Sequence, residues 1–255
     1  MNDDQPSPAA PEESGTPEGR RVIALLWDPP TTPHSRGPKP KLSHRQVVEA
    51  GIALADREGL EQVSMRKVAT TLGVGAMSLY TYIPGRSELV ELMLDAAYAE
   101  HGRPDPETGW RTRIDTLIRE TWALYRRHPW ILDYNQARLP LGPHVLDVEE
   151  CLYAAIADAG FAGSDNVAVA NFIHWQLLGA GRSMIGDERE ARRTGVSADA
   201  YWDARSSFWA THFDPARYPA MFAIWQAGGF DDTGNYSLDR LITWLLNAID
   251  RVRPA

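Results

Sequence analysis

The chain has 255 residues, of which 44% are hydrophobic and 24% are charged, enough to bury the core of one large domain or two smaller ones. No run approaches the roughly 18 apolar residues that would span a membrane, and the acidic, proline-rich N-terminus lacks the apolar segment of a secretory signal. Cys151 is the only cysteine, which excludes an intrachain disulfide and a thiolate metal cage within one chain. We therefore expect a cytoplasmic protein.

The charge is unevenly spread along the chain. A net charge of −8 at pH 7 argues by itself against a nucleic-acid partner. Residues 36–86, however, hold eight Lys or Arg against four Asp or Glu, so this segment carries about +4 and the remainder about −12. A small basic module on an acidic body is typical of local contact with nucleic-acid phosphates.

Residues 1–41 are predicted to form an N-terminal arm. Residues 1–20 are rich in Pro, Ser, Asp and Glu and lack aromatic side chains, so we expect them to be disordered. Residues 22–27 form a short apolar run that is either a docked arm or a short strand. Residues 29–40 contain five prolines, which favours an extended linker. Its end is basic, through Arg36, Lys39 and Lys41.

Four short helices are predicted after this linker. Ser43 is a good N-cap for a helix that ends at Gly59, and Ser64 caps a second helix. A Gly-Val-Gly turn leads to a third helix over residues 76–83, which a Pro-Gly pair ends. A fourth helix follows over residues 88–101.

The second and third helices and their glycine turn match a helix-turn-helix. Two short helices that cross steeply need glycine in the connecting turn. A shared apolar seam leaves the other face of the third helix free to enter a DNA major groove. Small side chains there permit close approach to base edges, hydroxyls can bond bases or phosphates, and a Met can contact a thymine methyl. The predicted base-reading residues are Ala76, Met77, Ser78, Thr81 and Tyr82.

Donors suited to phosphate contact surround that face. Basic arms that precede such heads often reach a minor groove or the DNA backbone. Tyr80 has an alternative interpretation as a core aromatic, but its place opposite the apolar seam favours exposure. The predicted backbone contacts are Ser64, Arg66, Lys67, Tyr80, Tyr82 and Arg86, together with Arg36, Lys39 and Lys41 of the arm. The predicted partner is double-stranded DNA.

Residues 42–94 resemble the TetR family of bacterial regulators. The resemblance is carried by Val-Ser-Met-Arg-Lys-Val-Ala at 63–69, Leu-Gly-Val at 72–74 and Leu-Tyr-Thr-Tyr at 79–82. The family's hallmark Tyr falls on Tyr80. Tyr82 stands where the family often has a His, and Arg86 where it often has a Lys.

This resemblance implies a homodimer that binds a palindromic operator, usually as a repressor, and that releases the DNA when a small-molecule effector binds its C-terminal body. The C-terminal part is similar to the body of the tetracycline repressors. The position that aligns with their drug-holding His is Tyr134, which puts tetracycline itself in doubt.

The rest of the chain predicts further helices, so the fold class is all-α. We expect helices over residues 110–127, 130–134, 143–159, 165–185, 201–211, 218–226 and 237–252, and a mobile polar loop over 186–200. The predicted domains are a helix-turn-helix domain over residues 42–87 and a ligand-binding and dimerisation domain over 88–255. Helix 165–185 with helix 237–252 is the predicted dimer face.

The body is rich in aromatic side chains, which allows two interpretations. For any one residue, core or dimer packing is the ordinary role. The other interpretation is a largely apolar cavity for a small apolar or aromatic effector. Its predicted wall is Leu117, Thr121, Trp122, Tyr125, Tyr134, Leu152, Phe172, Trp175 and Gln176.

Catalytic and metal chemistry find little support in the sequence. The histidines lack an i, i+4 ligand pair with a nearby carboxylate, so we expect neither a metal nor a cofactor. A glycine-rich stretch at 179–183 lies inside a helical pattern, which favours close helix packing over a phosphate loop. An all-α enzyme acting on a small molecule remains the alternative function, although no nucleophile–base pair supports it. A scaffold whose head binds a protein is a third possibility, which salt dependence would distinguish from DNA binding.

Overall fold

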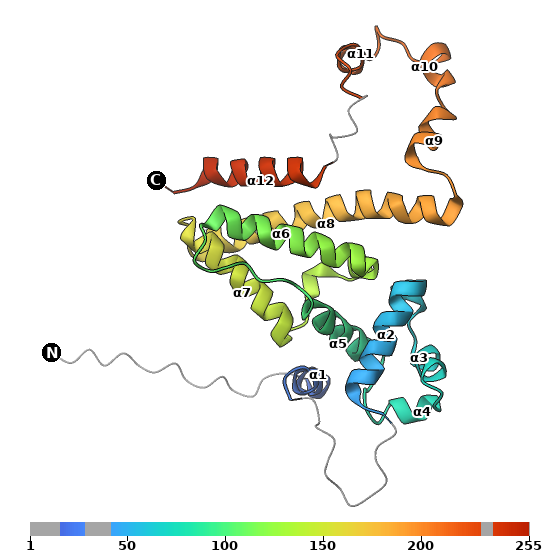
Figure 1. Cartoon of the computed structure of the whole chain (residues 1–255), viewed down its shortest axis with the longest axis vertical. Helices are drawn as coiled ribbons and strands as arrows, with labels where there is room; N and C mark the ends of the chain where they lie inside the picture. Colours follow the sequence, from blue (N-terminus) through green and yellow to red (C-terminus); the bar gives the residue numbers. More distant parts are fainter. Residues whose placement is uncertain (1–15, 29–41, 231–236, 255) are drawn as a thin grey trace, which may run out of the picture.

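The computed structural model describes residues 16–28, 42–230 and 237–254, and within them every regular element is a helix (Figure 1). The expected all-α fold is confirmed. The elements in chain order are α1 (Pro17–Trp27), α2 (His44–Glu58), η1 (Leu60–Gln62), α3 (Met65–Thr71), α4 (Ala76–Leu79), α5 (Arg86–Tyr98), α6 (Trp110–Arg127), η2 (Pro129–Asp133), η3 (Gln136–Arg138), α7 (Pro143–Asp158), α8 (Gly163–Thr194), α9 (Ala198–Asp203), α10 (Ser207–Thr211), α11 (Pro219–Gln226) and α12 (Leu238–Val252).

We call α2, η1, α3 and α4 the head. Ser43 caps α2 as predicted: its hydroxyl accepts from the Gln46 amide at 3.3 Å, while the Gln46 side chain accepts from the Ser43 amide at 2.9 Å, a capping box. Gly59 ends the helix with a φ of 90°, a conformation that costs a residue with a Cβ more than it costs glycine. These local features fix where the first helix of the head begins and ends.

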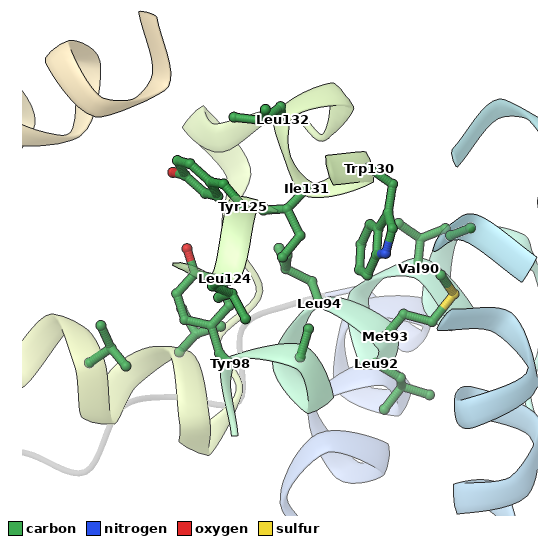
Figure 2. Packing of buried hydrophobic residues seen from close by; sticks show 14 of the residues in the cluster. Val90, Leu92, Met93, Leu94, Tyr98, Leu124, Tyr125, Trp130, Ile131 and Leu132 are labelled. Atoms are coloured by element: carbon green, nitrogen blue, oxygen red, sulfur yellow. The ribbon is translucent and has the colours of Figure 1, made fainter. Parts of the chain in front are cut away.

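The connecting helix α5 packs against α2 on one side and against α7 on the other. Its buried side chains include Met93 and Leu94, and Figure 2 shows them beside Trp130, Ile131 and Tyr125 from the body. One continuous apolar core therefore runs from the head into the body through α5. A displacement in one part is felt in the other because close-packed interiors deform little.

We call α6, η2, η3, α7, α8 and α12 the body. Helices α6, α7 and α8 pack against one another, and α12 packs on α6 (Figure 1). Gly181 lies at the crossing of α8 with η2, where an added Cβ would come within 2.9 Å of Leu132. Close packing is confirmed at Gly181, whereas Gly179 has nothing within 4 Å of an added Cβ.

One prediction about the N-terminal arm was wrong, since residues 17–20 are helical rather than disordered. Of the two alternatives for the apolar run of residues 22–27, the structure shows the docked arm and not the strand, in the form of the helix α1. The Thr16 hydroxyl caps the helix by accepting from the Gly19 amide at 3.1 Å, and Pro17 suits its first turn. Val22, Leu25 and Leu26 are buried, and α1 packs on α5.

The predicted mobile loop over residues 186–200 was also wrong. Helix α8 continues to Thr194 and ends at Gly195, which has a φ of 73°. Its last turns are charged and are held by ion pairs such as Arg193–Glu190 at 2.5 Å. Pairs three or four residues apart stabilise a solvated helix that buries little apolar surface, so polarity alone did not indicate a loop here.

The third helix of the head is shorter than predicted. It ends at Leu79 instead of continuing to residue 83, and the amides of Tyr82 and Ile83 both donate to the Leu79 carbonyl at 2.9 Å. The last part of the predicted helix is therefore a hydrogen-bonded turn. Residues 201–211, predicted as one helix, belong to the two short helices α9 and α10.

We call α9, α10 and α11 with their connections, residues 197–230, the aromatic segment. Figure 1 shows it curving away from the body beyond the end of α8. None of its residues is buried, although it carries Tyr201, Trp202, Phe208, Trp209 and Trp225 on its surface. Such a concentration of exposed rings is typical of a surface that binds another protein.

Candidate nucleic-acid interface

Helices α3 and α4 with their glycine turn form the predicted helix-turn-helix. Ser64 caps α3 by accepting from the Lys67 amide at 3.3 Å. Gly73 adopts a φ of 67°, and the following amide of Val74 donates to the Ala69 carbonyl at 3.0 Å. This bond closes the end of α3 and turns the chain into α4.

The two faces of α4 and its turn differ sharply in exposure. Leu79 and Ile83 are fully buried, whereas Met77 is 80% exposed. Ser78 and Thr81 are exposed, and Ala76 is half-buried at the start of the helix. The outer face of α4 is therefore accessible to a partner, while its inner face is fixed in the core.

Two tyrosines follow the helix. Tyr80 is 44% exposed, as its position opposite the seam predicts. Tyr82 is half-buried: its ring meets His44 edge-on at 5.6 Å, and its carbonyl accepts from His44 Nε2 at 2.7 Å. Tyr82 therefore fixes the turn to α2, and its ring is less available to DNA than that of Tyr80.

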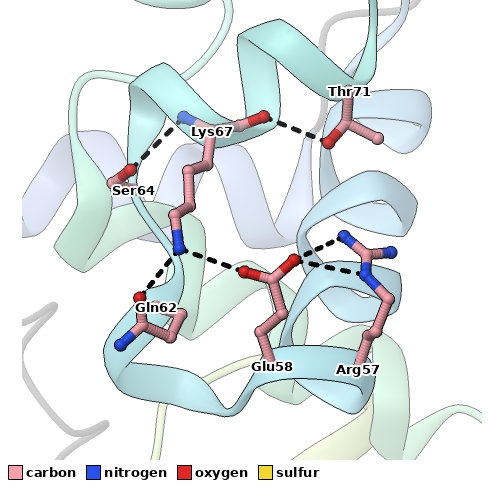
Figure 3. Close-up of polar contacts among 6 residues, drawn as sticks. All are labelled: Arg57, Glu58, Gln62, Ser64, Lys67 and Thr71. Carbon is pink, nitrogen blue, oxygen red and sulfur yellow. Dashed lines mark hydrogen bonds and ion pairs between the residues drawn. The ribbon is translucent and has the colours of Figure 1, made fainter.

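Three of the predicted phosphate donors, Ser64, Lys67 and Arg86, form hydrogen bonds to other groups of the protein. Figure 3 shows Lys67 Nζ between Glu58 Oε2, at 3.0 Å, and Gln62 Oε1, at 2.8 Å. Glu58 also accepts from Arg57 at 2.9 Å, and these bonds to Lys67 and Arg57 lower its pKa. Lys67 therefore joins α3 to the end of α2.

Arg86 is bonded in the same region. Its Nε donates to the Val63 carbonyl at 2.7 Å and its Nη2 to the Leu60 carbonyl at 2.8 Å. Sequence reasoning missed this role because carbonyl partners leave no side-chain pattern. By contrast, Arg66 is exposed, and no hydrogen bond or ion pair joins its guanidinium to another residue that the structure describes. Arg36, Lys39 and Lys41 lie outside the described residues.

The body holds a cavity of about 460 Å³ between α5, α6, η3, α7 and α8. Three residues of the predicted ligand wall line it: Thr121, Tyr125 and Trp175. Its other lining residues, which sequence reasoning missed, include Tyr98, Gln136, Glu149, His174 and Arg182.

The remaining predicted wall residues do not line this cavity. Leu117, Trp122 and Leu152 are buried in the core, which agrees with the alternative of core packing. Tyr134 is turned to the Arg138 carbonyl, to which its hydroxyl donates at 2.8 Å. Phe172 and Gln176 lie on the exposed face of α8. Phe172 and Gln176 each follow a cavity-lining residue, Asn171 and Trp175, by one position, which rotates them about 100° around α8 and away from the cavity.

The cavity combines aromatic rings with a few polar groups. Burial, reinforced by nearby Glu149, raises the pKa of Tyr125 to about 12 and that of Tyr98 well above its ordinary value. Both hydroxyls are therefore protonated donors at neutral pH. Glu149 lies 3.2 Å from His174 Nε2. A cavity with this lining is suited to an aromatic molecule that carries hydrogen-bonding groups.

Within residues 16–28, 42–230 and 237–254, no three His, Cys, Asp or Glu side chains are grouped so as to hold a metal ion. None of the helices in those ranges combines the length and the apolarity that a membrane crossing requires.

Comparison with known proteins places this geometry in a family. The family model described as tetracyclin repressor-like, C-terminal domain, matches residues 103–243. The chain is 40% identical over 239 residues to the HTH-type transcriptional repressor DrrR1 of Streptomyces coeruleorubidus, which covers 92% of this chain and 88% of that protein. It is 27% identical over 147 residues to the tetracycline repressor protein class E of Escherichia coli, which covers 55% of this chain and 67% of that protein.

A solved structure shows the same fold. ActR of Streptomyces coelicolor, in complex with actinorhodin, superposes with a TM-score of 0.69 at 20% identity, over 82% of this chain and 95% of that one. Together with the family model and the match to DrrR1, this likeness extends the resemblance seen in residues 42–94 to the body. The chain belongs to the TetR family of transcriptional regulators.

Proposed function

We propose that this regulator represses transcription as a homodimer, that residues 42–87 bind a palindromic operator, and that residues 88–255 bind a small aromatic effector that releases the DNA. The observation that carries the proposal is the contrast within α4 and its turn, where Leu79 and Ile83 are fully buried and Met77 is 80% exposed. Buried seam residues hold the helix rigidly, so its outer face is presented in a fixed orientation to a major groove.

Base reading is assigned to Ala76, Met77, Ser78 and Thr81. Their side chains are small or flexible and stand at the tip of the head, with Met77 most exposed. Arg66 and Tyr80 are assigned to the DNA backbone on either side. Lys67 and Arg86 contribute through the bonds that hold η1 and α3 in place, and Ser64 through the cap of α3. The arm residues Arg36, Lys39 and Lys41, which precede the head in the sequence, are proposed to supply further positive charge for DNA.

The effector site is assigned to the cavity between α5, α6, η3, α7 and α8. Trp175, Tyr98 and Tyr125 offer ring surfaces, while the two hydroxyls, Gln136 and Arg182 offer hydrogen bonds. A ligand can shift operator affinity only by binding the two head arrangements with different affinity. The side chains of α5 in this core provide the mechanical link, since α5 also packs on α2.

The homodimer is assigned to the outer face of α8, to α12 and to the aromatic segment. Phe172 on the outer face of α8 is 36% exposed and Trp244 on α12 is 61% exposed. The aromatic segment joins these two helices along the chain and buries none of its rings, among them Trp202 at 63% exposure. A second copy of the chain that covers all three surfaces explains why one protomer leaves them bare.

A change of charge in the aromatic segment tests the dimer. We expect Trp202→Glu combined with Trp225→Glu to weaken self-association at least tenfold, because both side chains would place a carboxylate in an apolar interface. Sedimentation velocity measures this, with Glu190→Gln on the exposed end of α8 as the control. A double variant that sediments as the wild type does would exclude this segment from the interface.

A titration of operator DNA tests the function as a whole. Labelled DNA from just upstream of the gene, or a site selected from a random pool, is titrated with the purified chain at two salt concentrations with random competitor. We expect nanomolar, salt-sensitive binding that survives competitor. Binding that competitor abolishes, for every selected sequence, would contradict the proposal.

We also propose that the chain is not an enzyme and that its cavity binds a ligand without transforming it. The relatives of the chain are named as transcriptional repressors. The check is mass spectrometry of a bound effector after prolonged incubation, in which the ligand should be recovered unchanged.

A further inference from the structure

One carboxylate of the head binds two side chains of the body. Asp56 lies on α2, and its Oδ1 accepts from His128 Nδ1 at 2.8 Å and from Trp130 Nε1 at 2.9 Å. The partners lie 72 and 74 residues away along the chain, at the end of α6 and in η2. Trp130 is almost fully buried against α5, as Figure 2 shows. These bonds therefore bridge the head and the body directly, without passing through α5.

The environment of His128 makes this bridge charge-sensitive. The side chain of His128 is only 6% exposed and lies between two carboxylates, Asp56 on one side and Glu100, whose Oε2 is 3.4 Å from His128 Nε2, on the other. Glu100 also pairs with Arg127 at 2.5 Å. These are the charged groups that α2, the end of α5 and α6 turn toward the ring. His128 Nε2 is buried, and Glu100 is its polar partner, at the long distance of 3.4 Å.

The element that carries Trp130, η2, is hydrogen-bonded to two side chains that line the cavity. Arg182 Nε of α8 donates to the Leu132 carbonyl at 3.0 Å, and Gln136 Nε2 donates to the Ile131 carbonyl at 2.8 Å. Arg182 and Gln136 both line the cavity. A molecule that drew either side chain toward itself would pull on the carbonyls of η2, one and two residues from Trp130.

We propose that Asp56, His128 and Trp130 form a latch that sets the orientation of the head on the body, and that occupation of the cavity reaches the latch through η2. The proposal rests on the proposed function, since the head's orientation matters only if two heads must meet an operator at a fixed spacing. The latched arrangement is the one that binds DNA. The three residues are positioning residues, because none of them lies on the exposed face of α4.

The latch also predicts a dependence on pH. Burial lowers the pKa of His128, but the hydrogen bond and charge of Asp56, with those of Glu100, outweigh it, and the pKa stands above its ordinary value. A protonated ring holds both carboxylates. As pH rises through the raised pKa, the ring loses its charge and the latch weakens, so operator affinity falls.

The test compares Asp56→Asn and Trp130→Phe with a matched control, Asp147→Asn. Asp147 of α7 forms an ion pair at 3.0 Å with Arg103, which lies in the connection between α5 and α6. Operator affinity is measured from pH 6 to 9 on the full chain. We expect both latch variants to lose about tenfold in affinity at pH 6, a size typical of coupling between sites. The gap between wild type and Asp56→Asn should shrink as pH rises, while Asp147→Asn follows the wild type.

Hydrogen–deuterium exchange separates the latch from the function on which it rests. If Asp56→Asn binds the operator as the wild type does at every pH, the latch is overturned, and it is overturned as well if Asp147→Asn loses affinity to the same extent. If the wild type itself selects no DNA, the proposed function fails instead. In that case the rate of amide hydrogen exchange in α2 and η2 tests the latch on its own. Faster exchange in Asp56→Asn than in Asp147→Asn supports the latch, and equal exchange overturns it.

Discussion

Arg86 supports the proposed DNA-binding surface through hydrogen bonds inside the protein. Its guanidinium fork reaches the carbonyls of Leu60, at the start of η1, and of Val63, between η1 and α3. Planar guanidinium groups satisfy two acceptors at once, whereas a lysine ammonium offers only a point charge. The charge therefore acts first on the shape of the head, and through that shape on DNA.

Arg86→Ala should destabilise the chain by about 2 kcal/mol, because two carbonyls lose a charged donor. The operator affinity should fall with it. Chemical denaturation measures the first effect and anisotropy the second, with Tyr80→Phe as the contrast. Tyr80 is exposed, so the loss of its hydroxyl should weaken DNA binding several-fold and leave the free energy of unfolding unchanged. An Arg86→Ala chain of wild-type stability that binds DNA poorly would show that Arg86 acts on phosphate alone.

At the scale of elements, the junction of α5 with α7 depends on a buried carboxylate. Asp95 of α5 accepts from the amides of His144 at 2.9 Å and Val145 at 3.0 Å, and from His144 Nδ1 at 2.8 Å. It therefore caps a helix to which it does not belong. Gly142 precedes that helix, and an added Cβ there would collide with the Asp95 carboxylate.

Asp95→Ala should cost about 2 kcal/mol, since the first turn of α7 loses its cap and its amides become unsatisfied. Gly142→Ala should cost a similar amount by displacing the same carboxylate. Thermal unfolding measures both, and Asp147→Ala on the exposed side of α7 is the control. Wild-type stability in Asp95→Ala would mean that water replaces the cap without loss.

Element boundaries show what the sequence could and could not predict. Caps with side-chain oxygens, such as Ser43, Ser64 and Ser237, act over three residues, and the helices that they begin lie where they were expected. The end of α8 was missed because ion pairs, not apolar spacing, hold it. The cavity wall was missed in part because its polar members, Glu149 and Arg182, come from helices whose mutual rotation only tertiary packing decides.

At the scale of the whole molecule, stability and regulation share titratable groups. The pKa of His128 is raised on folding, so its contribution to stability is present below the unfolded value near 6.5 and is lost as pH rises through the folded value. Burial lowers the pKa of His101, so its contribution has the opposite sign and is lost as pH falls. The contributions of His128 and His101 to the change of unfolding free energy with pH therefore have opposite signs near neutral pH.

His128→Gln isolates one of these slopes. The difference in unfolding free energy between wild type and His128→Gln should decrease steadily from pH 6 to pH 9, because the wild type alone gains from the charged ring. Urea denaturation at each pH gives that difference. A difference that grows with pH would mean that the ring is neutral in the folded chain.

Selection of DNA from a random pool shows whether the exposed face of α4 reads base sequence. Wild type and Met77→Ala, with Tyr80→Phe as the backbone-contact control, are each carried through the same selection and their sites are sequenced. We expect a palindromic site for the wild type, a changed or relaxed preference at one symmetric pair of positions for Met77→Ala, and the wild-type site, bound more weakly, for Tyr80→Phe. Identical sites for wild type and Met77→Ala, at equal affinity, would show that the exposed face of α4 does not read DNA.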